Sequence, residues 1–390
     1  MKSNFHRFAV VLMGLTAACT LIGRGGNTPQ NQPPATEPVA TNVSPAKVED
    51  ASHVARVGTL FRGTIGTAKV EMDIKREGGN LTGNYYYLKS GSANRLALKG
   101  TVAADNSFTM QEQDAAGKQT GEFTGKWKDD ANDAGVVLEG EWRKPGQKDE
   151  GQGFLAYEQM VDFASTQITT REIKESIKEK KATLSAEYPE LSGNANAAGF
   201  NVLAKAAVMR SLAEFRKDLA GMTAADIKRT DGETGNYIDV GYDVEFADDD
   251  LISVNFGEDT YEGGAHPNQG NFTLTYDLKA GHEVKLADLF KPASKYLVTI
   301  ADYSKRDLQG RKDPESGENM GFATDIFEDG AKPTVDNYRC WNVTKKGLLI
   351  TFPPYQVSAY AFGTQTVIVP LSVLKDIARA DGALAKVKSK

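Results

Sequence analysis

Hydrophobic and polar residues alternate in short runs over residues 56–157, which is the period-two pattern of half-buried β-strands. Turn-forming pairs, such as Gly78-Gly79 and Ser90-Gly91, separate eight such runs at even intervals. The pattern predicts one all-β domain, either a meander or a small barrel. A phrase of the form Leu/Phe-x-Gly-x-aromatic recurs loosely in this region. We interpret its aromatic residues as core and barrel-wall positions, with a sugar-stacking face as the alternative; they are Tyr85, Tyr86, Tyr87, Trp127 and Trp142.

The pattern becomes helical and strongly charged over residues 158–185, which predicts a charged helical linker or an exposed edge. Residues 186–193 then indicate a strand broken at Pro189. Residues 198–220 form the clearest helix, because their apolar side chains fall on one face and their charged side chains on the other. Such a helix must pack on a sheet.

Further strands and helices follow up to about residue 380. The pattern predicts a hairpin over residues 237–256, a strand and a second hairpin over 271–286, a helix over 294–308, and a hairpin around Lys346-Gly347. A buried strand, a closing helix from Leu371 and a frayed tail complete the chain. We therefore expect a multidomain protein, in which an α+β domain of helices packed on an antiparallel sheet occupies residues 186–380.

The N-terminus has the features of a secreted lipoprotein. Residues 1–18 carry Lys2 and Arg7 before an apolar run that is too short to span a bilayer, as in a secretory signal. The run ends in Leu-Thr-Ala-Ala-Cys19, which resembles a bacterial lipobox, so we predict lipidation of Cys19 and a membrane contact through that anchor only. The protein would face the periplasm, from the outer membrane if the cell is Gram-negative. Cleavage after Ala18 would instead release it into the periplasm. Residues 19–55 are rich in Pro, Asn, Gln and Thr, which predicts a disordered tether.

Gly263, Gly264 and Pro267 predict a rigid turn just before the strand at 271–276. The order of GGAHPN, a strand ending in Tyr-Asp, a glycine turn and LADLF resembles the C-terminal domain shared by RsiV-type lysozyme-sensing anti-sigma factors and PdaC-type peptidoglycan deacetylases. The likeness covers residues 186–377 and implies binding of a lysozyme-type protein. RsiV-type factors also have a cytoplasmic domain and a membrane helix, which we do not expect here, so we carry over ligand capture but not signalling. Deacetylase activity in the family resides in a separate metal-dependent domain, which nothing in this sequence resembles.

Catalytic motifs give no positive signal, so we predict no catalytic residue, no metal and no cofactor. We interpret His266 as a structural residue that donates to a backbone carbonyl, with a metal ligand or acid as the alternative. We expect His282 to be exposed. Cys19 and Cys340 are the only cysteines, so a disulfide scaffold is not expected, and Cys340 would be a small buried side chain.

Charge is unevenly distributed along the chain. The formal net charge is −6, and loss of Lys2 and Arg7 with the signal would make it −8. Residues 230–278 contain no Lys or Arg but twelve acidic residues, which argues against nucleic acid and favours a cationic partner. Solvated turn carboxylates are the alternative, and the consecutive acids at 248–250 lack the alternating spacing of a calcium loop. The predicted partner-binding residues are Asp248, Asp249, Asp250, Glu258, Asp259, Tyr261, Glu262, His266, Tyr355 and Tyr360.

Together these features predict a non-enzymatic envelope lipoprotein that binds a cationic protein such as a lysozyme-type muramidase. The first alternative is a peptidoglycan- or polysaccharide-binding protein, with Tyr261, Tyr355, Tyr360 and Phe362 stacking on sugar rings. The second alternative is a hydrolase that uses carboxylates near His266.

Overall fold

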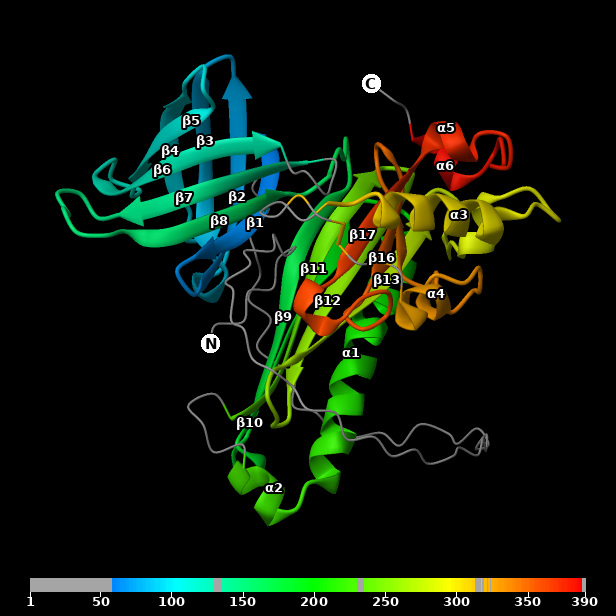
Figure 1. Cartoon of the computed structure of the whole chain (residues 1–390). Coiled ribbons are helices and arrows are strands. Elements are labelled where there is room, and N and C mark those ends of the chain that lie inside the picture. The colour runs from blue at the N-terminus through cyan, green and yellow to red at the C-terminus, as the bar shows by residue number, and fades with distance from the viewer. Residues whose placement is uncertain are drawn as a thin grey trace.

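In a computed structural model of the protein, the described residues are 58–129, 135–229, 235–312, 317, 319–320, 322 and 324–387 (Figure 1). The predicted signal, Cys19 and the predicted tether lie outside these ranges, as do Asp231 and Glu233. Within the ranges, no helix combines the length and apolarity needed to cross a membrane. A β-barrel is followed by a sheet-rich region with a few helices, which confirms the predicted multidomain fold.

The first domain is a closed, eight-stranded antiparallel barrel, drawn in blue to green-cyan in Figure 1. Each strand pairs with the next, and β1 closes the barrel by pairing with β8. This arrangement leaves no free edge. The strands are β1 (Thr59–Ile65), β2 (Ala68–Glu77), β3 (Asn80–Tyr87), β4 (Leu96–Val102), β5 (Ser107–Gln113), β6 (Gln119–Asp129), β7 (Val136–Arg143) and β8 (Gln152–Glu158).

The recurring Leu/Phe-x-Gly-x-aromatic phrase serves the barrel wall. A Cβ atom at Gly83, Gly125 or Gly140 would lie 2.0–2.2 Å from a carbonyl oxygen of the neighbouring strand, so only glycine allows this close approach. Four of the five aromatic residues pack in or against the barrel core: Tyr85 is fully buried, while Tyr87, Trp127 and Trp142 are half-buried. Tyr86 is buried outside this core, beneath the Arg95 guanidinium. The interpretation of these aromatics as core and wall positions is therefore confirmed for the ring packing.

A six-stranded sheet follows, in the order β14-β13-β12-β11-β10-β9. Helix α1 (Ala197–Gly221) covers one face of this sheet, as predicted, and connects the parallel strands β10 and β11. The short helix α2 (Ala224–Arg229) follows it. The strands are β9 (Gln167–Ile177), β10 (Ala182–Ser192), β11 (Asn236–Asp248), β12 (Leu251–Tyr261), β13 (Asn268–Asp277) and β14 (His282–Glu283).

Two predictions about the start of this sheet are wrong. Residues 158–185 do not form a helical linker: β9 is an edge strand and the 3-10 turn η2 (Lys178–Lys180) joins it to β10, so the exposed-edge alternative is the one observed. Charged residues protect such edges from pairing with other chains. Pro189 does not break β10 either. It is tolerated because β11 pairs only with Ala182–Ala186, so no strand needs the missing N–H of Pro189 on that side.

A three-stranded antiparallel sheet with several helices forms the last part of the chain. Its strands are β15 (Trp341–Val343), β16 (Gly347–Phe352) and β17 (Gln365–Pro370). Helix α3 (Tyr296–Gln309) confirms the predicted helix at 294–308. The shorter elements are η1 (Leu88–Ser90) in the barrel, η3 (Leu286–Leu289), α4 (Asp325–Gly330), η4 (Tyr360–Phe362), α5 (Leu371–Leu374) and α6 (Ala383–Lys386).

The structure corrects two further predictions here. The strand expected through Val284 and Leu286 ends after the two residues of β14, and η3 follows. The tail predicted to fray is packed as far as it is described: Leu384 and Val387 are buried in the core, and Lys386 lies 2.7 Å from the Asp277 carboxylate. Residues 388–390 lie outside the described residues.

The last part of β13, from Leu274 to Tyr276, is buried on both faces, although its alternation predicts only one buried face. Its Thr275 hydroxyl lies 2.8 Å from that of Ser253 in β12, and both residues are covered by β15. The Ser253 hydroxyl accepts bonds of 3.0 Å from the Asn342 side chain and the Val343 N–H. Hydrogen bonds therefore join the two sheets where the sequence pattern indicates a solvated face.

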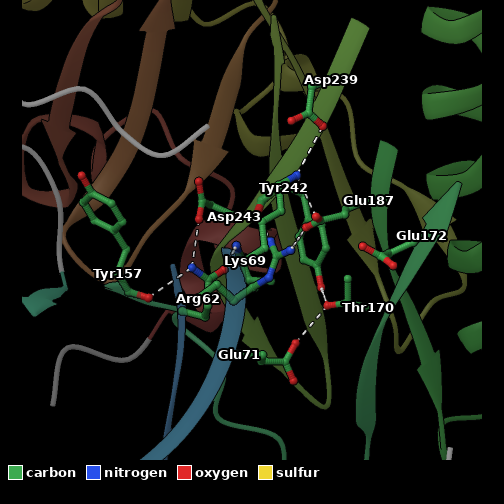
Figure 2. Close-up of polar contacts among 12 residues, drawn as sticks. Arg62, Lys69, Glu71, Tyr157, Thr170, Glu172, Glu187, Asp239, Tyr242 and Asp243 are labelled. Atoms are coloured by element: carbon green, nitrogen blue, oxygen red, sulfur yellow. Dashed lines mark hydrogen bonds and ion pairs between the residues drawn. The ribbon is translucent and has the colours of Figure 1, made fainter. Parts of the chain in front are cut away.

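Buried charges fix the barrel against the six-stranded sheet (Figure 2). Arg62 of β1 is 3% exposed; its guanidinium donates to Glu187 and to the Tyr242 carbonyl, and lies 3.8 Å from the centre of the Tyr242 ring. Lys69 of β2 bridges Glu187 at 2.8 Å and Asp239 at 3.3 Å. Beside this network, the segment after β8 forms backbone hydrogen bonds with β11. The Met160 N–H donates to the Val244 carbonyl, and the Ala247 N–H donates to the Met160 carbonyl. The barrel and sheet thus share a polar, water-poor interface.

We predict that Glu187→Gln will destabilise the protein by about 3–5 kcal/mol, because it leaves the buried Arg62 and Lys69 charges without their shared carboxylate. Chemical denaturation of the full-length protein, followed by circular dichroism, measures the change. Glu190→Gln on the same strand is the matched control. It removes a half-exposed pair with Arg171 and should cost less than about 1 kcal/mol. Equal losses in the two variants would contradict the assigned role of Glu187.

Candidate functional site

The predicted glycine turn is present at the end of β12. Gly263 and Gly264 have φ values of 96° and 113°, which favour glycine. The Tyr261 hydroxyl donates to the Gly264 carbonyl at 3.1 Å and closes the turn. The turn therefore holds the following residues, including His266, in a fixed position beside β12.

His266 contacts two tyrosines of the later segment. Its Nδ1 atom lies 2.8 Å from the Pro267 carbonyl oxygen, and because a carbonyl only accepts, Nδ1 carries the proton. The imidazole stacks on the Tyr360 ring at 3.7 Å and 17°, and its Nε2 lies 3.4 Å from the Tyr355 hydroxyl. Tyr360 also donates to the Pro267 carbonyl at 2.6 Å. His266 thus makes the predicted donation to a backbone carbonyl.

Tyr355 is the most prominent side chain at this position. It is 55% exposed, and its backbone has a φ of 69°, a left-handed conformation that costs a tyrosine on the order of 1–2 kcal/mol. The next residue, Gln356, anchors the loop by donating to the Gly330 and Asn337 carbonyls at 3.1 and 2.8 Å. The ring lies 5.5 Å from that of Tyr360. An exposed aromatic ring is therefore held in a preformed position.

Tyr237 and Asp259 extend the same surface. Tyr237 in β11 pairs with Tyr261 in β12, and their rings stack at 6.1 Å and 27°. The Tyr237 hydroxyl lies 3.3 Å from Asp259, which is 6% exposed. Burial and then the Asp259 charge raise the pKa of both Tyr237 and Tyr360, so both hydroxyls stay protonated at neutral pH. We call this group of five rings the aromatic corner; its members are Tyr237, Tyr261, His266, Tyr355 and Tyr360.

Sequence reasoning missed Tyr237. The signal that could have found it is strand register: once β11 and β12 are recognised as a hairpin, Tyr237 falls directly opposite Tyr261.

Glu258 and Glu262 lie on the other face of the sheet, beside α1. Ser211 of α1 donates to the Glu258 carboxylate. Burial raises the pKa of both Glu258 and Glu262. A like charge on α1 raises each pKa further: Glu214 acts on Glu258, and Asp218 acts on Glu262. We call these four residues the α1-side carboxylates. The sequence did not reveal Glu214 and Asp218, because a helix far away in sequence contributes them.

Asp248, Asp249 and Asp250 lie at the opposite end of the β11–β12 hairpin, roughly 30 Å from the aromatic corner along the strands. Asp248 accepts from the Asp250 and Leu251 N–H groups, both at 2.9 Å. Asp249 accepts from the N–H groups of residues 164–166 at 2.9–3.3 Å. These bonds indicate a structural role in the turn.

The acidic run of the sequence is therefore not one acidic surface. Besides the turn acids, Asp239 pairs with Lys69, Asp243 accepts from Gln159, and Asp277 pairs with Lys386. Alternation along β12 places Asp259 and Glu258 on opposite faces. A run without Lys or Arg can still be neutralised by cations from distant segments, which the local charge count does not show.

Metal-ligand and thiol chemistry give no further site in the described part of the chain. There, no three His, Cys, Asp or Glu side chains gather closely enough to hold a metal ion. Cys340 is buried, as predicted, and its thiol donates to the Asn271 carbonyl at 3.0 Å. Burial raises the pKa of this thiol to about 11.

Two protein families match the segments that build the aromatic corner. Residues 175–269 match the family described as deacetylase PdaC, and residues 287–372 match the family described as a protein of unknown function, DUF3298. The chain thus contains a PdaC domain and a DUF3298 domain. Tyr237, Tyr261 and His266 belong to the PdaC domain, whereas Tyr355 and Tyr360 belong to the DUF3298 domain.

Individual relatives each cover part of this chain. Peptidoglycan-N-acetylmuramic acid deacetylase PdaC of Bacillus subtilis (strain 168) is 25% identical over 142 residues, which are 36% of this chain and 29% of the deacetylase. The chain thus spans less than a third of that relative. A DUF3298 family member from Bacteroides fragilis has a TM-score of 0.42 at 20% identity, covering 58% of this chain and 98% of its own. A DUF3298 protein from Pseudomonas aeruginosa has a TM-score of 0.37 at 12% identity, covering 55% and 94%.

We predict that Asp249→Asn will lower stability at neutral pH by about 1 kcal/mol, because charged hydrogen bonds to three N–H groups are weakened. Burial acts to raise the pKa of Asp249, but the bonds from residues 164–166 outweigh it, so the folded pKa is lowered. This contribution is present above the unfolded pKa of about 3.9 and is lost as pH falls through the folded pKa.

The stability difference between the wild type and Asp249→Asn should therefore shrink in acid, which thermal unfolding from pH 3 to 7 measures. Asp250→Asn is the control, since the Asp250 carboxylate accepts no hydrogen bond from the described residues. A pH-independent difference would rule out the proposed charge effect.

Proposed function

We propose that this chain is a non-enzymatic, lipid-anchored protein of the cell envelope that binds a protein partner at the aromatic corner, with a cationic lysozyme-type muramidase as the leading candidate. The observation that carries the proposal is the convergence of tyrosines from the PdaC and DUF3298 domains around His266. The likeness of the GGAHPN-to-LADLF stretch to RsiV-type lysozyme sensors supports the choice of partner.

The corner has the chemistry of a protein-binding hot spot. Tyrosine is enriched among the residues that dominate binding energy, because its ring gives contact area and its hydroxyl gives a hydrogen bond. Tyr355 is already held in its strained backbone conformation, so little ordering remains to oppose binding. These properties favour a rigid partner surface.

Charge favours a cationic partner. The chain carries a formal charge of −6, and the α1-side carboxylates are close enough to repel one another. These carboxylates lie near the same end of β12 as the aromatic corner, on the other face of the sheet, so they would attract a positive partner and increase the association rate without contacting it at the corner. The carboxylates that favour such a partner are Glu214, Asp218, Glu258 and Glu262, and not the turn acids at 248–250.

The environment of His266 supports a binding role without catalysis. Its Nδ1 proton is held by the Pro267 carbonyl, and its Nε2 faces a tyrosine hydroxyl. The B. subtilis relative is named a deacetylase, but the match covers 29% of that protein. The same packing weakens the case for a hydrolase centred on this histidine.

A second candidate is binding of peptidoglycan glycan. The exposed Tyr355 ring beside Tyr360 presents aromatic surface of the kind on which sugar rings stack, and the B. subtilis relative is named as a peptidoglycan-modifying enzyme. Phe362 also lies in this segment, in η4.

We predict that Tyr355→Ala will weaken binding to a cationic lysozyme at least about tenfold, because it removes the exposed anchor of the corner. Surface plasmon resonance at several salt concentrations measures the effect. Wild-type affinity should fall as salt rises. Val335→Ala is the control, since Val335 is 61% exposed but is not part of the corner.

Absence of binding by the wild type at low salt would reject the muramidase. Sedimentation with purified sacculi then tests the glycan. Wild-type protein that pellets while Tyr355→Ala stays in solution would favour the second candidate, and wild-type protein in the supernatant would reject it.

We predict that Cys19→Ser will move the protein from the membrane fraction to the soluble periplasmic fraction, because the acyl anchor would be lost. Cell fractionation and immunoblotting measure this, with Cys340→Ser as the control. Equal fractionation of wild type and Cys19→Ser would contradict lipid anchoring.

A further inference from the structure

A carboxylate points into one end of the barrel. In β5, Phe108, Met110 and Glu112 alternate inward, and Glu112 is only 3% exposed. The first two pack in the apolar core that Tyr85 and Phe123 also join. Burying a charged group among such residues costs free energy unless hydrogen bonds or an opposite charge compensate.

Neutral groups provide the hydrogen bonds to Glu112. The Tyr85 hydroxyl lies 2.5 Å and the Trp142 indole Nε1 2.7 Å from the same oxygen, Oε2. The other oxygen, Oε1, accepts no hydrogen bond from the described residues, and it is not completely shielded from solvent. The carboxylate therefore has donors but no cation among the described residues, and one of its oxygens keeps some contact with solvent.

Aromatic rings surround this oxygen pair at the rim of the barrel. Tyr87 packs edge-on against Tyr85 at 5.5 Å, with hydroxyls 3.4 Å apart, and both Tyr87 and Trp142 are half-buried. Gly121 makes the arrangement possible, because a Cβ there would lie 2.3 Å from the Trp142 nitrogen and 2.8 Å from Glu112 Oε2.

We propose that this end of the barrel, formed by Glu112, Tyr85, Tyr87 and Trp142, binds a small cationic group of the ammonium class. The oxygen Oε1 supplies the counter-charge, and the aromatic rings of Tyr87 and Trp142 at the same end of the barrel add the attraction of π-systems for a cation. This site is separate from the aromatic corner and is independent of the proposed partner.

A purely structural brace makes a different prediction. Glu112 ties β5 to β3 and β7 through Tyr85 and Trp142, and a glutamine oxygen could accept the same two bonds. A brace therefore needs only the acceptor oxygen, whereas a cation site needs the charge.

The experiment uses ¹⁵N-labelled protein and choline as the probe, with 3,3-dimethylbutan-1-ol as its neutral isostere. The chain has three tryptophans, so three indole signals are expected, and Trp142→Phe assigns the one of interest. We expect choline to shift the Trp142 signal saturably in the wild type and the alcohol to leave it unchanged. Glu112→Gln should weaken choline binding at least about tenfold.

The proposal is overturned if choline gives no saturable shift below about 10 mM, if Glu112→Gln binds as tightly as the wild type, or if the neutral isostere binds equally. Should Glu112→Gln fail to fold, Tyr87→Leu at the half-exposed rim replaces it, and the same loss of affinity is expected. Glu122→Gln on the neighbouring strand is the matched charge control and should bind choline like the wild type.

Discussion

The ion pair between Arg62 and Glu187 determines how the molecule is assembled. Each side chain comes from a different domain, and each has almost no contact with water. Lys69 and Asp239 continue the pair toward its partly exposed side, and the carboxylates of Glu71 and Asp243 also act on Arg62. Burying such groups is costly, and the cost is offset only when every charge meets its partner in one geometry. The network thus favours a single orientation of the barrel on the sheet.

Strand β11 links this interface to the aromatic corner. It provides Tyr242 and Asp239 to the contacts with the barrel, and Tyr237, two residues before Asp239, to the ring cluster. Tyr237 is positioned by its neighbours in β12, and Tyr360 by the Pro267 carbonyl. The corner is therefore built by the six-stranded sheet and the DUF3298 domain together, and neither part builds it alone.

Local periodicity was sufficient to predict the elements that bury one face. The barrel strands, helix α1 and the β11–β12 hairpin follow from alternation or amphipathic spacing. Local periodicity gave the wrong element where polar side chains form ion pairs or hydrogen bonds with residues distant in sequence. Residues 167–177 have a charged pattern typical of a helix, yet they form β9, because Arg171 and Glu175 find partners on β10 and α1. For the same reason, the sequence could suggest Tyr261, His266, Tyr355 and Tyr360 as site residues but could not separate them from Asp248–Asp250.

The hydroxyl-lined contact between the two sheets also affects synthesis of the chain. Strand β13 ends at Asp277, whereas β17, the last strand of the three-stranded sheet that packs on it, ends about 90 residues later at Pro370. At usual translation rates the ribosome needs roughly 5–20 seconds for that stretch. During this interval the Ser253 and Thr275 hydroxyls can hydrogen-bond to water. The uncovered face of the nascent sheet is therefore hydrophilic and less prone to aggregate with other newly made chains. The residues that later join the sheets can thus protect the unfinished protein from aggregation.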